Sequence, residues 1–172
     1  VDGVDLEVRA GEFFSMLGPS GSGKTTCLRL IAGFEQPESG DIRIFGHSMR
    51  SDPLPALAQL GVVFQMPTLD PDLTVRDNLT YHAALHGLSR REAAERAGME
   101  LARLGVSDRS ADKVRVLSGG QRRRLDVALG IVGRPTLLFL DEPTTGFDPE
   151  ARRQFWSLIR SLRELGTTML LT

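Results

Sequence analysis

The residues with the clearest chemical meaning form a glycine-rich segment between a short apolar run and a helical pattern. The segment reads Gly18-Pro19-Ser20-Gly21-Ser22-Gly23-Lys24-Thr25, which matches the pattern G-x-x-x-x-G-K-[ST] of loops that hold phosphate groups. Its glycines let backbone N–H groups turn toward one point, and the start of the next helix adds positive potential there. Lys24 supplies a full charge and Thr25 a hydroxyl for Mg²⁺. Kinases, GTPases and many ATPases all carry such a loop, so the loop alone does not identify the class of enzyme.

Two adjacent carboxylates, Asp141 and Glu142, follow an apolar run at 136–140. The run has the composition of a buried strand, and open α/β sheets bind ligands at the carboxyl ends of their strands. There Asp141 can hold Mg²⁺ through water, and Glu142 can polarise an attacking water. The alternative is a carboxylate pair without a metal, which the phosphate loop makes less favoured.

A second candidate anion site is Leu117-Ser118-Gly119-Gly120-Gln121, called the LSGGQ segment below. Ser118 is a suitable N-cap, and two glycines leave the first helical N–H groups open to an anion. Alone, the segment is more typical of an ordinary capped helix than of an anion site. Together with the phosphate loop, it gives one chain two elements that could bind phosphate.

Strand and helix patterns alternate along the sequence. Strands are predicted at 4–8, 13–17, 41–45, 61–64, 136–140 and 167–171, and helices at 25–32, 75–85, 90–104, 118–132 and 149–165. This alternation predicts a mostly parallel α/β sheet. Because the pattern at 66–116 is helical, we expect a small helical subdomain there, inserted into a core made of 1–65 and 117–172.

Composition sets the broad class of the protein. The 172 residues suit a single domain, and 41% apolar with 25% charged residues is typical of a globular protein. A net charge of −1 gives no electrostatic reason to bind nucleic acid or an anionic membrane directly. The single cysteine, Cys27, forms no disulfide within the chain, which favours an intracellular location. No apolar stretch approaches the roughly 18 residues of a membrane span.

The order of these motifs resembles that of the ATP-binding subunit of an ABC transporter. The phosphate loop comes first, Gln65 follows a short strand, the LSGGQ segment is next, and Leu-Phe-Leu-Asp-Glu-Pro at 138–143 precedes Asp148. The resemblance covers the whole chain, 1–172, and is strongest to ATPases of type-2 exporters of the daunorubicin-resistance kind. The features that suggest this subgroup are Gln-Arg-Arg-Arg-Leu-Asp at 121–126, Pro-Thr-Thr-Gly-Phe-Asp-Pro at 143–149 and the stretch at 73–79.

This resemblance implies a P-loop NTPase fold of the ABC type: a mostly parallel sheet flanked by helices, a small antiparallel β portion and the inserted helical subdomain. It implies ATP and Mg²⁺ as cofactors, with Glu142 and Gln65 as catalytic residues and with Thr25, Gln65 and Asp141 around the metal. The residues implied to bind ATP are Gly18, Pro19, Ser20, Gly21, Ser22, Gly23, Lys24, Thr25 and Thr26.

The resemblance also implies partners. Ser118, Gly119, Gly120 and Gln121 would contact ATP held by an opposite subunit, and Asp148 would belong to a loop between subunits, so a homodimer is expected. The helical subdomain would dock onto a separate transmembrane permease that exports a drug or antibiotic, a lipid or a polysaccharide. The chain would then be peripheral, on the cytoplasmic face of the cell membrane, with no direct nucleic-acid partner. The alternative is a soluble ABC-type ATPase that acts on ribosomes or DNA.

The sequence also departs from the family pattern. An aromatic residue that stacks on adenine would precede Val1, and a switch histidine would follow Thr172, so we expect the chain to be truncated at both ends. Phe147 stands where leucine is usual, and Arg123 stands where glutamine is usual in the helix after the LSGGQ segment.

Overall fold

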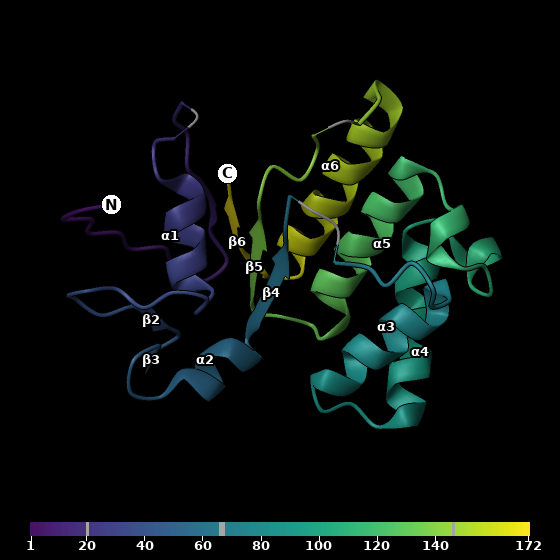
Figure 1. Ribbon diagram of the computed structural model, residues 1–172, viewed down its shortest axis with the longest axis horizontal. Helices are drawn as coiled ribbons and strands as arrows, with labels where there is room; N and C mark the ends of the chain where they lie inside the picture. The colour runs from purple at the N-terminus through teal and green to yellow at the C-terminus, as the bar shows by residue number, and fades with distance from the viewer. Residues whose placement is uncertain (20, 66–67, 146) are drawn as a thin grey trace.

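The centre of the structure is a parallel β-sheet. The computed structural model describes residues 1–19, 21–65, 68–145 and 147–172. In this part of the chain a four-stranded sheet has the order β1-β6-β5-β4, and its neighbouring strands are parallel (Figure 1). The strands are β1 (Phe13–Ser15), β4 (Leu60–Val63), β5 (Leu137–Leu140) and β6 (Thr168–Leu171). The predicted parallel sheet is confirmed.

Helices cover both faces of this sheet. Helix α1 (Lys24–Ile31) lies on one side, and α5 (Gly119–Val132) and α6 (Pro149–Glu164) lie on the other (Figure 1). Successive side chains of a strand point to opposite faces. Accordingly, Phe139 packs with Leu28 of α1, whereas Leu138 and Leu140 belong to the larger cluster that α5 and α6 cover. Both faces of β5 are therefore buried, which explains its uninterrupted apolar sequence.

A group of helices packs against α5 on the side away from the sheet. It consists of α3 (Val75–Leu85) and α4 (Arg90–Arg103), followed by two short 3-10 turns, Ser107–Arg109 and Val114–Val116. Capping residues start both helices: the side chain of Thr74 accepts a hydrogen bond from the Asp77 N–H, and Ser89 forms a reciprocal capping box with Glu92. These helices lie in the stretch predicted to be helical, of which Met66 and Pro67 are outside the described residues.

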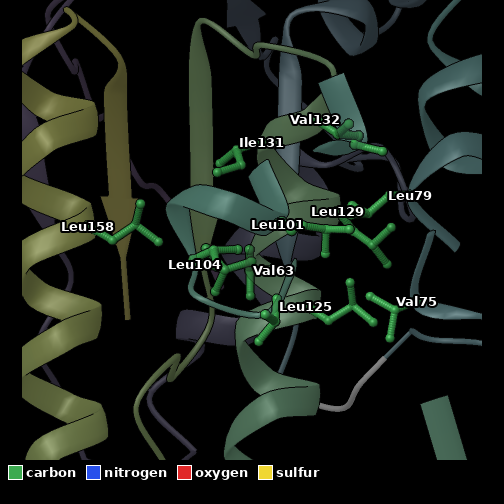
Figure 2. Packing of buried hydrophobic residues seen from close by; sticks show 14 of the residues in the cluster. Val63, Val75, Leu79, Leu101, Leu104, Leu125, Leu129, Ile131, Val132 and Leu158 are labelled. Atoms are coloured by element: carbon green, nitrogen blue, oxygen red, sulfur yellow. The ribbon is translucent and has the colours of Figure 1, made fainter. Parts of the chain in front are cut away.

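One apolar core connects the helical group with the sheet. Figure 2 shows Leu79, Leu101, Leu125 and Leu129 among the helices, together with Val63 of β4. These five side chains are at most 5% exposed. The helical group is therefore held by the same helix, α5, that begins at the LSGGQ segment. No helix in the described ranges has the length and apolar character needed to cross a bilayer.

The smaller elements lie at the edge of the molecule near α1. β2 (Arg43–Ile44) and β3 (His47–Ser48) form an antiparallel pair, and α2 (Pro53–Ala58) follows. The predicted strand at 41–45 is confirmed in a shorter form. The sequence patterns did not predict β3 or α2, because a two-residue strand and a six-residue helix are too short to show a period.

The predicted strand at 4–8 is wrong. These residues have no regular structure, and Val4 and Leu6 are 60% and 44% exposed. Alternation of apolar and polar residues produces a strand only where a neighbouring strand can accept and donate backbone hydrogen bonds. Among the described residues, no strand pairs with this segment.

Strand β4 and helix α5 approach each other through two glycines. A Cβ atom on Gly61 would lie 2.0 Å from the carbonyl oxygen of Gly130 and 2.7 Å from Cγ of Pro135. Backbone and ring atoms cannot move aside as a flexible side chain can. This close contact fixes α5 against the strand that leads to Gln65.

We therefore expect Gly61→Ala to lower the free energy of unfolding by about 2–3 kcal/mol, as overpacking of a tight contact does. The matched control is Gly98→Ala on α4, where a Cβ would meet no heavy atom within 4 Å among the described residues. There alanine should stabilise the helix by roughly 0.5–1 kcal/mol. Urea unfolding measures both variants, and equal effects at the two positions would contradict the close contact.

Candidate functional site

The phosphate loop has the backbone geometry that its sequence predicts. Gly21 and Gly23 have φ angles of +81° and +91°, in the left-handed region that glycine adopts without strain. Helix α1 starts directly after them, and its first backbone bond runs from the Cys27 N–H to the Gly23 carbonyl. The earlier N–H groups of α1, including those of Thr25 and Thr26, therefore have no partner within the helix and can bind an anion. Ser20 of the predicted loop lies outside the described residues.

The ammonium group of Lys24 lies over this loop. Its Nζ donates hydrogen bonds to the carbonyl oxygens of Gly18 and Pro19, at 2.7 Å and 2.9 Å, and to Oγ of Ser22 at 3.4 Å. Three acceptors match the three hydrogens of an ammonium group. The loop thus combines a full positive charge with the positive end of the α1 dipole.

Asp141 and Glu142 lie at the carboxyl end of β5, as predicted. Asp141 is only 6% exposed, and its Oδ1 accepts a 2.7 Å hydrogen bond from the Thr172 hydroxyl. The same hydroxyl oxygen accepts the Glu142 N–H at 3.2 Å. Thr172 follows β6, the neighbour of β5, so the sheet order brings it to the carboxylates. Sequence reasoning missed Thr172; the available signal was a polar residue directly after an apolar strand.

Glu142 has an unusual backbone conformation and defined partners. Its φ of +42° lies in the left-handed region, which is strained for a residue other than glycine. Its Oε2 accepts hydrogen bonds from Gln65 Nε2 at 3.2 Å and from Thr145 Oγ1 at 3.4 Å. Gln65 follows β4 and Glu142 follows β5, so two neighbouring strands bring them together. Strain of this kind gathers at functional sites.

The predicted Mg²⁺ ligands are chemically suited to that ion. They are the hydroxyl of Thr25 at the start of α1, the side-chain amide oxygen of Gln65 after β4 and the carboxylate of Asp141 after β5. Figure 1 shows that the start of α1 and the carboxyl ends of β4 and β5 lie at the same edge of the sheet. Oxygen ligands of this kind are those that Mg²⁺ prefers.

The LSGGQ segment starts α5 with a reciprocal capping box. Ser118 Oγ accepts the Gln121 N–H at 3.3 Å, and Gln121 Oε1 accepts the Ser118 N–H at 2.9 Å. The predicted N-cap at Ser118 is confirmed. These contacts give Ser118 and Gln121 a role within the chain, but they leave the two intervening glycines unexplained.

Packing within the chain does not require Gly119 or Gly120 to be glycine. A Cβ on either residue would meet no heavy atom within 4 Å in the described ranges, and neither residue has a positive φ. Glycine is less favourable than alanine in a helix, by up to about 1 kcal/mol in the helix interior. This cost is understandable if another molecule must approach the backbone closely at the start of α5.

A cleft of about 490 Å³ separates the first turn of α5 from Gln65. Gly119 and Gly120 line one side of it, and Thr145 and Phe147 also contribute. The described residues of the phosphate loop do not line this cleft, and helix α1, which follows the loop, lies across the sheet from α5 (Figure 1). A single chain therefore keeps its two predicted phosphate-binding elements apart. Asp148, predicted to lie between subunits, caps α6 by accepting the Ala151 N–H at 2.8 Å.

The fold and the site together define a nucleotide-binding protein of the phosphate-loop class. A model of the protein family described as "ABC transporter" matches residues 1–145. The chain belongs to the ABC transporter family. The resemblance noted from the sequence is thereby confirmed.

Individual relatives agree with this family. The chain is 44% identical to the daunorubicin/doxorubicin resistance ATP-binding protein DrrA of Streptomyces peucetius, over all of this chain and 52% of the relative. It is 45% identical to the Nod factor export ATP-binding protein I of Cupriavidus metallidurans, over all of this chain and 57% of the relative. The chain thus spans about half the length of these curated relatives.

A solved structure supports the fold. The dimeric post-hydrolysis state of the ATP-binding cassette MJ0796, bound to ADP and Pi, matches with a TM-score of 0.87 and 29% sequence identity. The match covers 98% of this chain and 77% of that chain. It confirms the predicted fold: a parallel sheet flanked by helices, a small antiparallel pair and a helical subdomain.

Proposed function

We propose that the complete protein hydrolyses ATP at two sites, each shared between two copies of the chain. The observation that carries this proposal is the pair Gly119 and Gly120. Both lie at a helix N-terminus and border a cleft, and a Cβ at either position would meet no heavy atom within 4 Å in the described part of the chain. A nucleotide held by the phosphate loop of a second chain would be the molecule that approaches them.

The residues at the sheet edge would have separate roles in ATP binding, Mg²⁺ binding and hydrolysis. The phosphate loop would bind the phosphates of ATP, and Thr25, Gln65 and Asp141 would surround Mg²⁺. When bound, Mg²⁺ neutralises charge on the phosphate oxygens. Glu142 would accept the proton of the attacking water, with its carboxylate oriented by Gln65 and Thr145.

A dimer would complete each site. Ser118, Gly119, Gly120 and Gln121 would contact the terminal phosphate held by the opposite chain, and Asp148 would lie in the loop that crosses between chains. The structure of MJ0796, which is dimeric and bound to ADP and Pi, supports this arrangement. Closure of the two chains around ATP and their separation after hydrolysis would then be the conformational output.

The output would drive export through a separate transmembrane permease. Support comes from the relatives, which are described as a drug-resistance protein and an export protein. The helical subdomain, within 66–116, would dock onto the permease and place the chain on the cytoplasmic face of the membrane. The substrate would be a drug or antibiotic, a lipid or a polysaccharide. Co-purification of the complete protein with a transmembrane partner tests this step; co-purification with ribosomes or DNA would favour the soluble alternative.

Nucleotide binding is tested at Lys24. We expect Mg-ATP to raise the melting temperature of the complete protein and Lys24→Ala to weaken ATP affinity about 10–100-fold, the effect of losing a charge-assisted hydrogen bond. The matched control is Lys113→Ala, at the only other lysine of the sequence, which is exposed. Calorimetric titration measures both variants. Equal ATP affinity in the two variants would contradict the role of the loop.

A further inference from the structure

A buried arginine on α5 joins the ends of two strands. Arg123 is 7% exposed, and its Nε donates to the carbonyl oxygen of Pro143 at 2.9 Å. Its Nη1 donates to the carbonyl oxygen of Phe64, and its Nη2 donates to that of Asp141 at 3.4 Å. Phe64 directly precedes Gln65, and Asp141 and Pro143 enclose Glu142. One side chain therefore contacts the backbone directly before Gln65 and on both sides of Glu142.

Asp126, one turn further along α5, adds a second connection. It is 4% exposed, and its Oδ2 lies 4.0 Å from Nη1 of Arg123. Its Oδ1 accepts hydrogen bonds from the backbone N–H and the hydroxyl of Thr68, at 3.0 Å and 3.5 Å. Arg123 thus binds the backbone of Phe64, directly before Gln65. Asp126 binds Thr68, three residues after Gln65.

Stability alone is a weak reason for this buried pair. Burial raises the pKa of Asp126 and lowers the pKa of Arg123, so each charge depends on the other. Replacing a buried ion pair by apolar residues is often neutral or stabilising. The planar guanidinium, however, can donate to several separate carbonyl groups at once, which no apolar residue can do. The pair therefore serves to hold the segments that follow β4 and β5 in fixed positions relative to each other.

We propose that Arg123 and Asp126 are positioning residues that fix Gln65 and the segment 141–143 relative to the start of α5. This inference rests on the proposed ATPase function. Because the LSGGQ segment begins the same helix, contact at Gly119 and Gly120 would be passed to the catalytic carboxylate through Arg123. The glycine contact between Gly130 and Gly61 holds the other end of the helix against β4.

The test separates positioning from stability in the complete protein. Arg123→Met should lower both the melting temperature and kcat, with kcat falling about 10–100-fold as for misplaced catalytic groups, and the KM for ATP should change less than about threefold. The double variant Arg123→Met/Asp126→Asn removes both buried charges, and its amide oxygen still accepts the hydrogen bonds of Thr68. It should recover melting temperature but not kcat. The control Ile131→Val, a buried position two turns along the same helix, should leave kcat near the wild-type value.

Two outcomes overturn the proposal: a normal kcat in Arg123→Met, or recovery of kcat together with melting temperature in the double variant. Hydrogen exchange without nucleotide gives an independent readout. The backbone amides of residues 63–65, 141, 142, 144 and 145 should exchange faster in Arg123→Met than in Ile131→Val, and equal exchange would contradict the positioning role. If the wild-type protein hydrolyses no ATP, the proposed function fails, while the exchange measurement still decides the role of Arg123.

Discussion

Replacing Glu142 by glutamine is expected to lower the ATP turnover of the complete protein by a factor of about 10²–10⁴. Glutamine has nearly the same size as glutamate, and its amide oxygen can still accept a hydrogen bond from Gln65 or Thr145. It cannot accept a proton from water. The phosphate loop and Lys24 are unchanged in this variant, so ATP affinity should persist.

Steady-state release of phosphate and equilibrium ATP binding, measured on the same preparation, check this prediction. Glu164→Gln is the matched control, because Glu164 is an exposed carboxylate at the last turn of α6. It should keep wild-type turnover. Near-normal turnover in Glu142→Gln would remove Glu142 from the role of general base, and a joint loss of binding and turnover would indicate damage to the whole site.

Gly120→Asp is expected to lower turnover roughly 100-fold or more without destabilising the chain. Among the described residues a Cβ at position 120 would meet no heavy atom within 4 Å, and an acidic residue in the first turn of α5 interacts favourably with the helix dipole. In a closed dimer the same carboxylate would face the terminal phosphate. Like charges about 4 Å apart near a protein surface cost about 4 kcal/mol.

Urea unfolding and turnover of Gly120→Asp should therefore change in different ways. Gly98→Asp is the control, since Gly98 is exposed on α4 and has free space around it among the described residues. Its turnover should match that of the wild type. Unchanged turnover in Gly120→Asp would show that nothing approaches α5 closely, and a large loss of stability would show that the glycine serves the fold.

The sequence predicted the bounds of helices and strands better than it predicted which strands lie side by side in the sheet. Helix α3 has the predicted bounds of 75–85, because Thr74 caps its start and glycine follows its end. The order of strands is not visible in the periodicity: β4 lies beside β5, although the whole helical group separates them in sequence. The prediction of a strand at 4–8 was wrong for a related reason. A strand forms only where a neighbouring strand pairs with its backbone, and alternation of residues does not show whether such a neighbour exists.

Residue types revealed the candidate site only where they form a motif. Lys24, Gln65 and Glu142 stand in recognisable strings. Lys24 starts α1, and Gln65 and Glu142 follow the carboxyl ends of β4 and β5, which lie with the start of α1 at one edge of the sheet (Figure 1). Arg123 lies in a run of three arginines, which is typical of a solvated helix face. The missed signal was its helical spacing with buried Val127 and Gly130, which puts Arg123 on the stripe that faces the sheet.

The proposed function requires ATP to bind between two copies of this chain. Light scattering of the complete Glu142→Gln protein measures this association, because bound ATP would be consumed only slowly. With Mg-ATP the measured mass should be twice that of one chain, and it should return to the mass of one chain without nucleotide or when Gly120→Asp is added. A mass of one chain with saturating Mg-ATP would contradict the binding of ATP between two copies of the chain.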